Sequence, residues 1–414
     1  MEFVTLTEEE FSTFSRNFQN KCFMQSTNVA ELRKRSGWDS SYVGIKKDNN
    51  IIAATLLISK KRHFKKEFYA IRGPLVDFED TETLTFFINN LKKYVKKSGG
   101  YILRIDPYLE IISRDKDFKA TGEFDYSYLK DTLKKLGFKE VVENTIQAKI
   151  MYVIDLNDSM DNLMMQMDPK TRQMIRKNEK MGIVIRKGTK EDLPLFEDIM
   201  EHTSERRHFL NRGEEFYKNM FDCYEKDNMI SLLFAELDIS LAKQNIENER
   251  MEIANTRMKR EENRKIGKCN EKKAKVQEKE EEDTLNRLIK KEEELNLLEK
   301  EYGNRVTLGG IIFILYENEV ASLVGGSYDK FKEYQPFYTL HYEMIKYAVE
   351  NNYQRYNFYA ICNTPDKNDP QYGIYLFKRS FGGHVLELMG EFILPTNKLV
   401  YHTLSIINKI KRGH

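Results

Sequence analysis

The sequence predicts a mixed α/β protein built from two similar units, the second of which is interrupted by a long helical hairpin. The chain has 414 residues, more than the ~250 to 300 at which a single core stops growing. Strand-like apolar runs alternate with amphipathic helical segments over most of its length. One stretch, Ser240 to Tyr302, instead carries sixteen basic and sixteen acidic residues, one glycine and no proline.

The first unit begins with a predicted strand hairpin at 42–59, where the polar turn Lys46 to Asn50 separates two apolar runs. An amphipathic helix is expected over Asp80 to Lys97, because its apolar residues fall on one face. Further strands before the charged stretch are predicted at 68–72, 101–105, 150–156, 183–186 and 229–237.

A similar order of hairpin, helix and strand recurs after the charged stretch. Strands are predicted at 308–316, 319–325, 355–359 and 384–392, with a helix over Tyr338 to Glu350. We therefore expect a first domain over 1–148, a second over 149–238 and 303–396, an inserted hairpin over 239–302 and a C-terminal helix over 397–414.

The charged stretch has the pattern of an antiparallel coiled coil. Ile239, Ile246 and Ile253 recur at heptad spacing in its first half, leucines recur in its second half, and Gly267 lies at the one credible turn. Each helix would have roughly 25 to 30 residues and a length on the order of 40 Å. A single charged helix or a disordered tract stays open, because 271–283 has few core residues.

Composition excludes several classes of protein. The longest apolar runs, such as Ile51 to Ile58, are far shorter than the ~18 residues of a membrane span. The acidic amino terminus lacks the features of a signal peptide, so a cytoplasmic location is expected. The four cysteines and seven histidines are scattered, which favours neither a disulfide framework nor a metal site, and no metal is expected.

Six segments in order resemble the Fem family of peptidoglycan bridge-forming aminoacyltransferases: AIRGPLVDFED (70–80), YILRIDPYLE (101–110), KKLGF (134–138), TSERRHF (203–209), YNFYAI (356–361) and YGIYLFKRSF (372–381). The resemblance covers nearly the whole chain. It implies two acetyltransferase-like (GNAT-like) domains, the second interrupted by the coiled-coil arm.

The resemblance also implies the activity and the partners. Members transfer an amino acid from aminoacyl-tRNA to the side-chain amine of the precursor stem peptide, usually on lipid II, or to a growing bridge. Glycine, alanine and serine all stay open as the amino acid. Peripheral contact with the inner membrane face and oligomers with related transferases are compatible with this function.

The chemistry requires little beyond the protein itself. An aminoacyl ester is already activated, so no cofactor is expected, and the site must orient the amine and stabilise an oxyanion. The resemblance assigns this role to the pair Phe377 and Lys378, whose ammonium would contribute ~3 to 4 kcal/mol. A surface lysine on a strand is the alternative. If this stretch is extended, Arg379 points to the opposite face.

The diphosphate of a lipid-linked precursor calls for cations. Arg206 is the best candidate, because a guanidinium binds phosphate oxygens in bidentate fashion, and Glu205 would orient it. The resemblance implies a second cation near the amino terminus, for which Arg33 and Lys34 are candidates. Solvated surface charge is the alternative for both of these residues.

Two further residues are candidates for contact with the precursor. Asp106 lies at a predicted strand end, where we expect it to position the substrate amine rather than to abstract a proton. A helix cap is the structural alternative. Tyr101 resembles a precursor-contacting tyrosine of the family, and a core tyrosine is the alternative.

The segment KTRQMIRKNEKMGIVIRK (170–187) has seven basic residues and one acidic residue. Arg172, Arg176 and Lys180 are spaced by four and would share one helix face, which favours salt-dependent binding of tRNA phosphates. A solvated helix end, the precursor diphosphate and an anionic membrane surface stay open as alternatives for this segment.

Two rival functions are compatible with the pattern. An acyl-CoA-dependent N-acetyltransferase would need a pyrophosphate loop between a strand and a helix, and the nearest matches, RKIGKC (264–269) and RSFGGH (379–384), lie in other contexts. A non-catalytic coiled-coil adaptor would use the α/β units only as a support.

Overall fold

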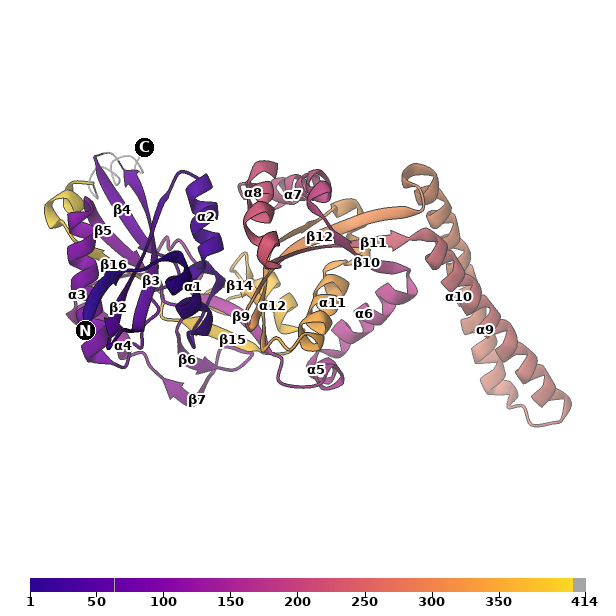
Figure 1. Cartoon of the computed structure of the whole chain (residues 1–414). Coiled ribbons are helices and arrows are strands. Elements are labelled where there is room, and N and C mark those ends of the chain that lie inside the picture. Colours follow the sequence, from indigo (N-terminus) through magenta and orange to yellow (C-terminus); the bar gives the residue numbers. More distant parts are fainter. Residues whose placement is uncertain (63, 405–414) are drawn as a thin grey trace.

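The computed structural model describes residues 1–62 and 64–404. Figure 1 shows two units side by side, each with a central sheet, and a helical arm that projects from the second unit. Within the described residues, no helix combines the length and apolar character needed to cross a bilayer. The expected mixed α/β fold with two similar units and an inserted helical hairpin is confirmed.

The first sheet has the strand order β1-β2-β3-β4-β5-β16-β8. Its strands are antiparallel neighbours except for β4 and β5, which are parallel and joined through helix α3. The strands are β1 (Glu2–Thr5), β2 (Asp39–Lys47), β3 (Asn50–Arg62), β4 (Lys65–Ala70), β5 (Gly100–Ile105), β8 (Lys139–Val141) and β16 (Glu391–Pro395).

The second sheet has the order β10-β11-β12-β13-β14-β9-β15-β6-β7. It repeats the parallel pair of the first sheet, here between β13 and β14 on either side of α11. The strands are β6 (Glu110–Arg114), β7 (Ala120–Asp125), β9 (Ile150–Asp155), β10 (Ile183–Gly188), β11 (Ile230–Asp238), β12 (Arg305–Tyr316), β13 (Glu319–Ser327), β14 (Arg355–Ala360) and β15 (His384–Leu388).

The two units exchange strands. β6 and β7 come from the first part of the chain but join the second sheet, whereas β16 returns from the carboxyl end to the first sheet. The expected boundary between 148 and 149 therefore does not follow the sheets. The single strand expected at 384–392 is also divided, because the chain passes from the second sheet to the first at Met389 and Gly390.

The helices cover both faces of the sheets (Figure 1). The α-helices of the two units are α1 (Glu8–Asn17), α2 (Thr27–Arg35), α3 (Thr81–Lys97), α4 (Leu129–Lys135), α5 (Met160–Gln166), α6 (Pro169–Lys180), α7 (Leu193–Arg207), α8 (Glu214–Tyr224), α11 (Phe337–Glu350) and α12 (Tyr372–Arg379). Short 3-10 helices lie at Phe23–Gln25, Lys190–Asp192, Glu225–Asp227 and Asp329–Tyr334.

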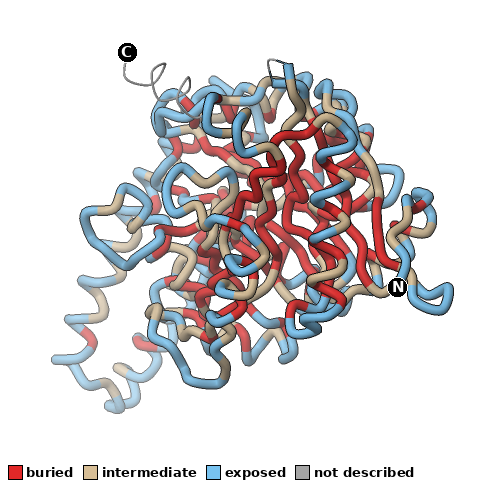
Figure 2. Tube along the Cα trace, turned by 90° about the vertical axis from the view of Figure 1, so that its left-hand side faces the viewer, coloured by how far each residue is buried: buried red, intermediate tan, exposed pale blue. Residues whose placement is uncertain are grey.

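One hydrophobic cluster belongs to both units. It joins Phe11 and Val29, from α1 and α2, to Phe196 and Phe221, from α7 and α8. Figure 2 shows buried chain running through the body of the protein, while most of the arm is exposed. Burial of each such phenylalanine contributes ~1.5 to 3 kcal/mol. The shared cluster therefore holds the two units against each other.

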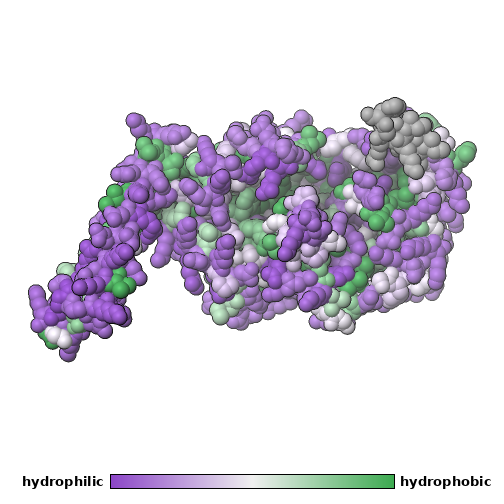
Figure 3. All heavy atoms as spheres, turned by 180° about the vertical axis from the view of Figure 1, so that it is seen from behind, coloured by the Kyte–Doolittle hydropathy of each residue, from purple (hydrophilic) through white to green (hydrophobic). Residues whose placement is uncertain are grey.

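The arm consists of α9 (Ile239–Lys265) and α10 (Glu271–Tyr302). Near its base the helices pack through buried Ile246, Leu288 and Leu295. Toward the tip the contact is ionic, with Arg260 paired to Glu281, and Figure 3 shows a largely hydrophilic arm surface. Of the helix expected over 397–414, 398–404 is helical, residue 397 precedes it, and 405–414 lies outside the described residues.

Gly383 is expected to be irreplaceable for steric reasons. Its φ is +87°, and a Cβ at this position would lie 2.1 Å from the carbonyl oxygen of Val153. Gly99 has a similar φ of +81° but open space around it. Urea denaturation of Gly99→Ala should show a loss of about 1 to 2 kcal/mol from backbone strain alone. Gly383→Ala should lose at least about 2 kcal/mol more, and equal losses would contradict this assignment.

Candidate active site

The parallel strands β13 and β14 part after a short contact. They pair only from Glu319 to Ala321 on β13, opposite Arg355 to Asn357 on β14. Beyond this point, β14 also shifts register against β9, between Asn357 and Ala360. Tyr359, inside the irregular segment, has a φ of +67°. The sheet therefore opens beside a bulge whose backbone carbonyls are free to accept hydrogen bonds.

Lys378 closes this bulge. Its Nζ donates to the carbonyl oxygens of Phe358 and Ala360, both at 2.7 Å. The side chain is partly exposed, yet no carboxylate of the described residues forms a salt bridge with it, and desolvation of the ammonium lowers the pKa of Lys378 to about 7. Two carbonyls fix the nitrogen, which leaves one further direction for a substrate oxygen.

The stretch that carries Lys378 is a helix, not the extended segment considered from the sequence. Lys378 and Arg379 lie in the last turn of α12. Their side chains still part, because the Arg379 Nε donates to Asp117 Oδ1 at 2.6 Å. Phe377 packs edge-on against Tyr338, with ring centroids 5.0 Å apart. The pair Phe377 and Lys378 thus divides into a packing residue and a cation.

A buried histidine lies behind the lysine. The His341 ring packs against Phe358, Phe377 and Phe381, at centroid distances of 4.8, 5.6 and 5.7 Å. Its Nδ1 lies 2.6 Å from the Tyr356 hydroxyl. Burial, and then the positive charge of Lys378, lower the pKa of His341 to about 3. The histidine is therefore neutral and contributes aromatic packing without a second charge.

The other side of the bulge faces a buried ion pair. Arg72 and Asp106 are each 2% exposed, and Arg72 Nη1 lies 3.3 Å from Asp106 Oδ2. Burial raises the pKa of Asp106 to about 6, although Arg72 acts against this rise. Burial also raises the pKa of Tyr359 to about 12, with Arg72 again opposing it. Asp106 is thus enclosed as the partner of Arg72 rather than open to a substrate amine.

Cations gather where the units meet. Arg33, in the last turn of α2, has a buried Nε with no hydrogen-bond partner among the described residues. Burial lowers the pKa of its guanidinium, and the nearby Arg212 adds to this effect. Arg212 precedes α8, which packs against α2, and its guanidinium stacks 4.8 Å from the Phe216 ring. Lys34 is exposed.

Arg206 and Glu205 lie at the exposed end of α7. The Arg206 Nη1 pairs with Asp329 Oδ1 at 3.0 Å. Within the described residues no polar contact joins Arg206 to Glu205, so the orienting carboxylate is Asp329. The motif picked from the sequence therefore lies a few residues before the cation, Arg212, that the fold brings next to Arg33.

Tyr101 is not part of this site. It is the second residue of β5, whereas Asp106 follows the end of that strand, which separates them by ~16 Å. Its hydroxyl donates to Glu67, and its ring packs with Ile102, Ile393 and Leu404. The structure favours the alternative of a core tyrosine.

The basic segment at 170–187 begins with helix α6. Arg172 is engaged internally, since its Nη1 donates to the carbonyl oxygens of Met164, Met165 and Met167. Arg176 and Lys180 are exposed. The helix starts against α12, where the Thr171 Oγ1 and Ser380 Oγ atoms lie 2.8 Å apart. Two of the three expected cations therefore remain available on a helix that adjoins the lysine.

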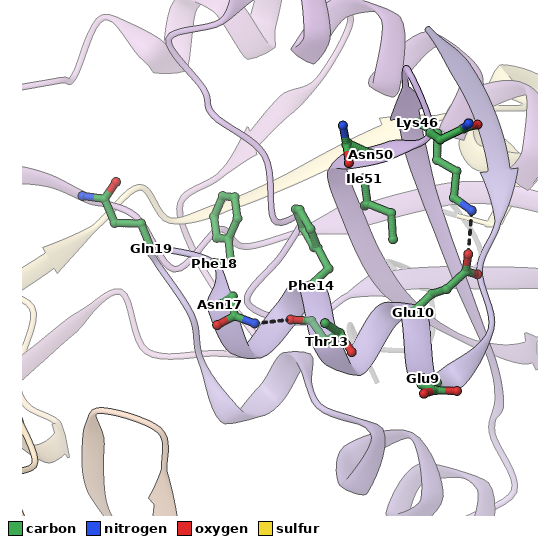
Figure 4. Close-up of a pocket in the computed structure, with 11 residues that line it drawn as sticks. Glu9, Glu10, Thr13, Phe14, Asn17, Phe18, Gln19, Lys46, Asn50 and Ile51 are labelled. Atoms are coloured by element: carbon green, nitrogen blue, oxygen red, sulfur yellow. Dashed lines mark hydrogen bonds and ion pairs between the residues drawn. The ribbon is translucent and has the colours of Figure 1, made fainter.

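Lys378 does not line either of two cavities in the first unit and at the junction of the sheets. One of about 660 Å³ lies between α1 and the β2–β3 hairpin, where Phe14, Phe18 and Ile51 face the space and Lys46 pairs with Glu10 (Figure 4). A polar cavity of about 230 Å³ lies at the junction of the sheets. Its buried Glu319 accepts a 2.6 Å hydrogen bond from the Tyr108 hydroxyl.

His341 makes the fold sensitive to acid. Its pKa is about 3 in the folded state and ~6.5 in an unfolded chain, so unfolding binds a proton below pH 6.5. Stability is thus lost as pH falls, by about 2 kcal/mol between pH 7 and pH 5 from this group. The free energy of unfolding, measured by urea denaturation at both pH values, should fall less between pH 7 and pH 5 in His341→Leu than in the wild type. The control variant His402→Leu, at an exposed position, should keep the wild-type dependence of stability on pH. If His341→Leu lost as much stability as the wild type between pH 7 and pH 5, the assignment would be contradicted.

The chain is similar to known proteins over nearly its whole length. The model of the FemAB family matches residues 6–409. Aminoacyltransferase FemA from Staphylococcus aureus, strains MRSA252 and N315, is 31% identical over 419 residues, covering 99% of each chain. A crystal structure of FemX superposes with a TM-score of 0.80 at 26% identity, over 97% of this chain and 99% of that one. The chain therefore belongs to the FemAB family and is an aminoacyltransferase.

Proposed function

We propose that the protein transfers an amino acid from aminoacyl-tRNA to the stem-peptide amine, or to the growing bridge, of a lipid-linked peptidoglycan precursor such as lipid II. The observation that carries this proposal is the Lys378 ammonium, fixed by two backbone carbonyls where β13 and β14 part. Such a cation is positioned before the reaction begins, which is the requirement for stabilising an oxyanion.

The reaction needs three groups near this opening. The precursor amine attacks the ester carbonyl of the aminoacyl-tRNA, and the carbonyl oxygen becomes the oxyanion that Lys378 stabilises. Collapse of the tetrahedral intermediate forms the amide bond and expels the ribose hydroxyl of the tRNA. The proton lost by the amine passes to that ribose oxygen, so the transfer is balanced without a protein base.

The donor would approach along the second unit. Exposed Arg176 and Lys180 extend along α6 away from Lys378, and the Asn245 side chain ties the end of α6 to the base of the arm. Twelve residues of helix span ~18 Å, which is several phosphate spacings. These cations supply sequence-independent affinity for the tRNA backbone.

The acceptor would approach between the units. Arg33 and Arg212 are neighbouring cations where α2 meets α8, and a diphosphate suits two guanidinium groups. A bound anion would offset the burial and, after it, the repulsion from Arg212 that lower the pKa of Arg33. Glycyl, alanyl and seryl esters all fit the same chemistry, and the mass of the product distinguishes them.

The acyl-CoA alternative is disfavoured by the positions of its two nearest loop matches. RKIGKC (264–269) lies at the tip of the arm, between α9 and α10. RSFGGH (379–384) joins helix α12 to strand β15, which is the reverse of a strand-to-helix loop. Neither joins a strand to the start of a helix, which is the context in which a pyrophosphate loop would bind. Isothermal titration with acetyl-CoA would overturn this preference if it gave saturable binding.

Replacement of Lys378 tests the catalytic role. Lys378→Met should lower kcat by about 10² to 10³ and leave the fold intact, because an oxyanion donor is lost while the aliphatic stem is kept. Single-turnover transfer from charged tRNA to lipid II measures this loss. Arg379→Met is the matched control, since its cation pairs with Asp117, and it should stay within about fivefold of wild type.

The pH dependence of Lys378→Arg identifies the active form of the lysine. With a pKa of about 7, the Lys378 ammonium is lost as pH rises through 7, whereas arginine stays charged. The ratio of wild-type to arginine-variant kcat should therefore fall above pH 7, independently of the substrate amine. A ratio that rises with pH would make Lys378 a general base instead of an oxyanion stabiliser.

Paired arginine variants test the acceptor path. Arg212→Met should raise KM for lipid II at least about tenfold with little change in kcat, because a charge-assisted contact to phosphate contributes about 1.5 to 3 kcal/mol. Arg206→Met, which removes a cation already paired to Asp329, should raise KM less. If KM rose more for Arg206→Met than for Arg212→Met, the diphosphate site would be assigned to Arg206.

A further inference from the structure

One end of the first sheet is strongly basic and partly apolar. The end of β3 and the start of β4 carry five cations around Phe64, whose side chain is 63% exposed. An exposed phenylalanine among cations is unusual for a solvated hairpin, where polar turn residues are preferred. The cations are Lys60, Lys61, Arg62, Lys65 and Lys66.

Other segments bring similar residues to the same end. Lys66 pairs with Gly100 at the start of β5, so the last turn of α3, with Lys96 and Lys97, lies at this end as well. The Thr396 Oγ1 donates to the Gly100 carbonyl oxygen at 3.0 Å, which places the following Lys398 and Leu399 beside it. Leu399 is 79% exposed.

We call these residues the basic end surface: Lys60, Lys61, Arg62, Phe64, Lys65, Lys66, Lys96, Lys97, Lys398 and Leu399. Two of its cations have carboxylate partners, Arg62 with Glu67 and Lys66 with Asp39. Among the described residues, no salt bridge involves the other six. The surface therefore keeps a large excess of positive charge around two bulky apolar side chains.

We propose that the basic end surface docks on an anionic lipid bilayer. Lysine and arginine near an anionic membrane gain ~1 kcal/mol each, and exposed phenylalanine and leucine gain further by entering the interfacial zone. Cations and apolar groups together favour a bilayer over a nucleic acid, because leucine neither stacks on bases nor contacts phosphates. The donor path along α6 also lies on the other unit.

The location of this surface fits a lipid-linked acceptor. The Lys60 Nζ donates to the Ser36 carbonyl oxygen at 3.4 Å and lies 5.5 Å above the Trp38 ring. Both residues directly follow α2, which carries Arg33. The diphosphate of a lipid-linked precursor lies at the bilayer surface, so one docking orientation brings it toward the arginines. This second step rests on the proposed function, whereas bilayer docking itself does not.

Co-sedimentation with vesicles tests the docking. The full chain is mixed with vesicles of pure phosphatidylcholine or with vesicles that contain about a third phosphatidylglycerol. The fraction of protein bound is then measured as a function of lipid concentration. We expect binding to the anionic vesicles that weakens with salt. The triple variant Lys61→Ala, Phe64→Ala, Lys65→Ala should bind at least about 25-fold more weakly, at about fivefold per cation.

A matched variant on the arm tests whether vesicle binding depends on the basic end surface or on positive charge anywhere on the protein. Lys272→Ala, Val276→Ala, Lys279→Ala removes two cations and one exposed apolar side chain from α10 and should keep wild-type vesicle binding. Equal binding of wild type to both vesicle types would overturn the proposal, as would equal losses in the two triple variants. A loss of tRNA affinity in the Lys61, Phe64, Lys65 triple variant, with vesicle binding retained, would assign the surface to nucleic acid instead.

Activity on two acceptors separates failure of docking from failure of the proposed function. The Lys61, Phe64, Lys65 triple variant should transfer normally to a soluble nucleotide-linked stem peptide and poorly to the lipid-linked precursor in anionic vesicles. A loss of transfer activity with both acceptors would mean that the β3–β4 hairpin supports the active site rather than docking on a bilayer. Wild-type protein inactive on both acceptors but bound to vesicles would refute the proposed function and leave the docking surface in place.

Discussion

The bulge in β14 is the feature on which the site depends. The positive φ of Tyr359 interrupts the ladder with β9 and releases the carbonyls of Phe358 and Ala360. Lys378 satisfies both carbonyls, so the irregular backbone and the cation stabilise each other. A partly desolvated cation without a carboxylate partner is costly. Its retention here, at the place where two parallel strands part, is the arrangement expected of a functional site rather than of a stabilising one.

The rest of the fold keeps this arrangement rigid. The exchange of β16 for β6 and β7 ties each sheet to both parts of the chain, and one apolar cluster contains side chains from α1 and α2 as well as α7 and α8. A hinge between the units would have to break both connections. The junction that holds Arg72, Asp106 and Arg33 is therefore preorganised, which lowers the entropic cost of bringing two large substrates together.

Charge is distributed by burial as much as by sequence. His341 and Lys378 lie in one aromatic enclosure, where desolvation makes the histidine neutral and lowers the pKa of the lysine to about 7. Arg33 has little competition from carboxylates, whereas Arg206 and Arg172 are engaged by internal partners. The net charge of +2 therefore conceals separate cationic surfaces on α6, at the junction of the units and at the end of the first sheet.

The sequence by itself determined the alternation of strands and helices and the antiparallel arm, because hydrophobic period is a short-range property. It offered Phe377 and Lys378 as a candidate pair only through the resemblance to a family. Only the tertiary structure decided that β16 joins the first sheet and that Lys378 lies on a helix. It also decided that Tyr359 and His341 lie next to Lys378 and that Arg212 lies near Arg33. Strand exchange, desolvation and the pairing of charges depend on residues distant in the chain, and no local pattern encodes which of several arginines remains free.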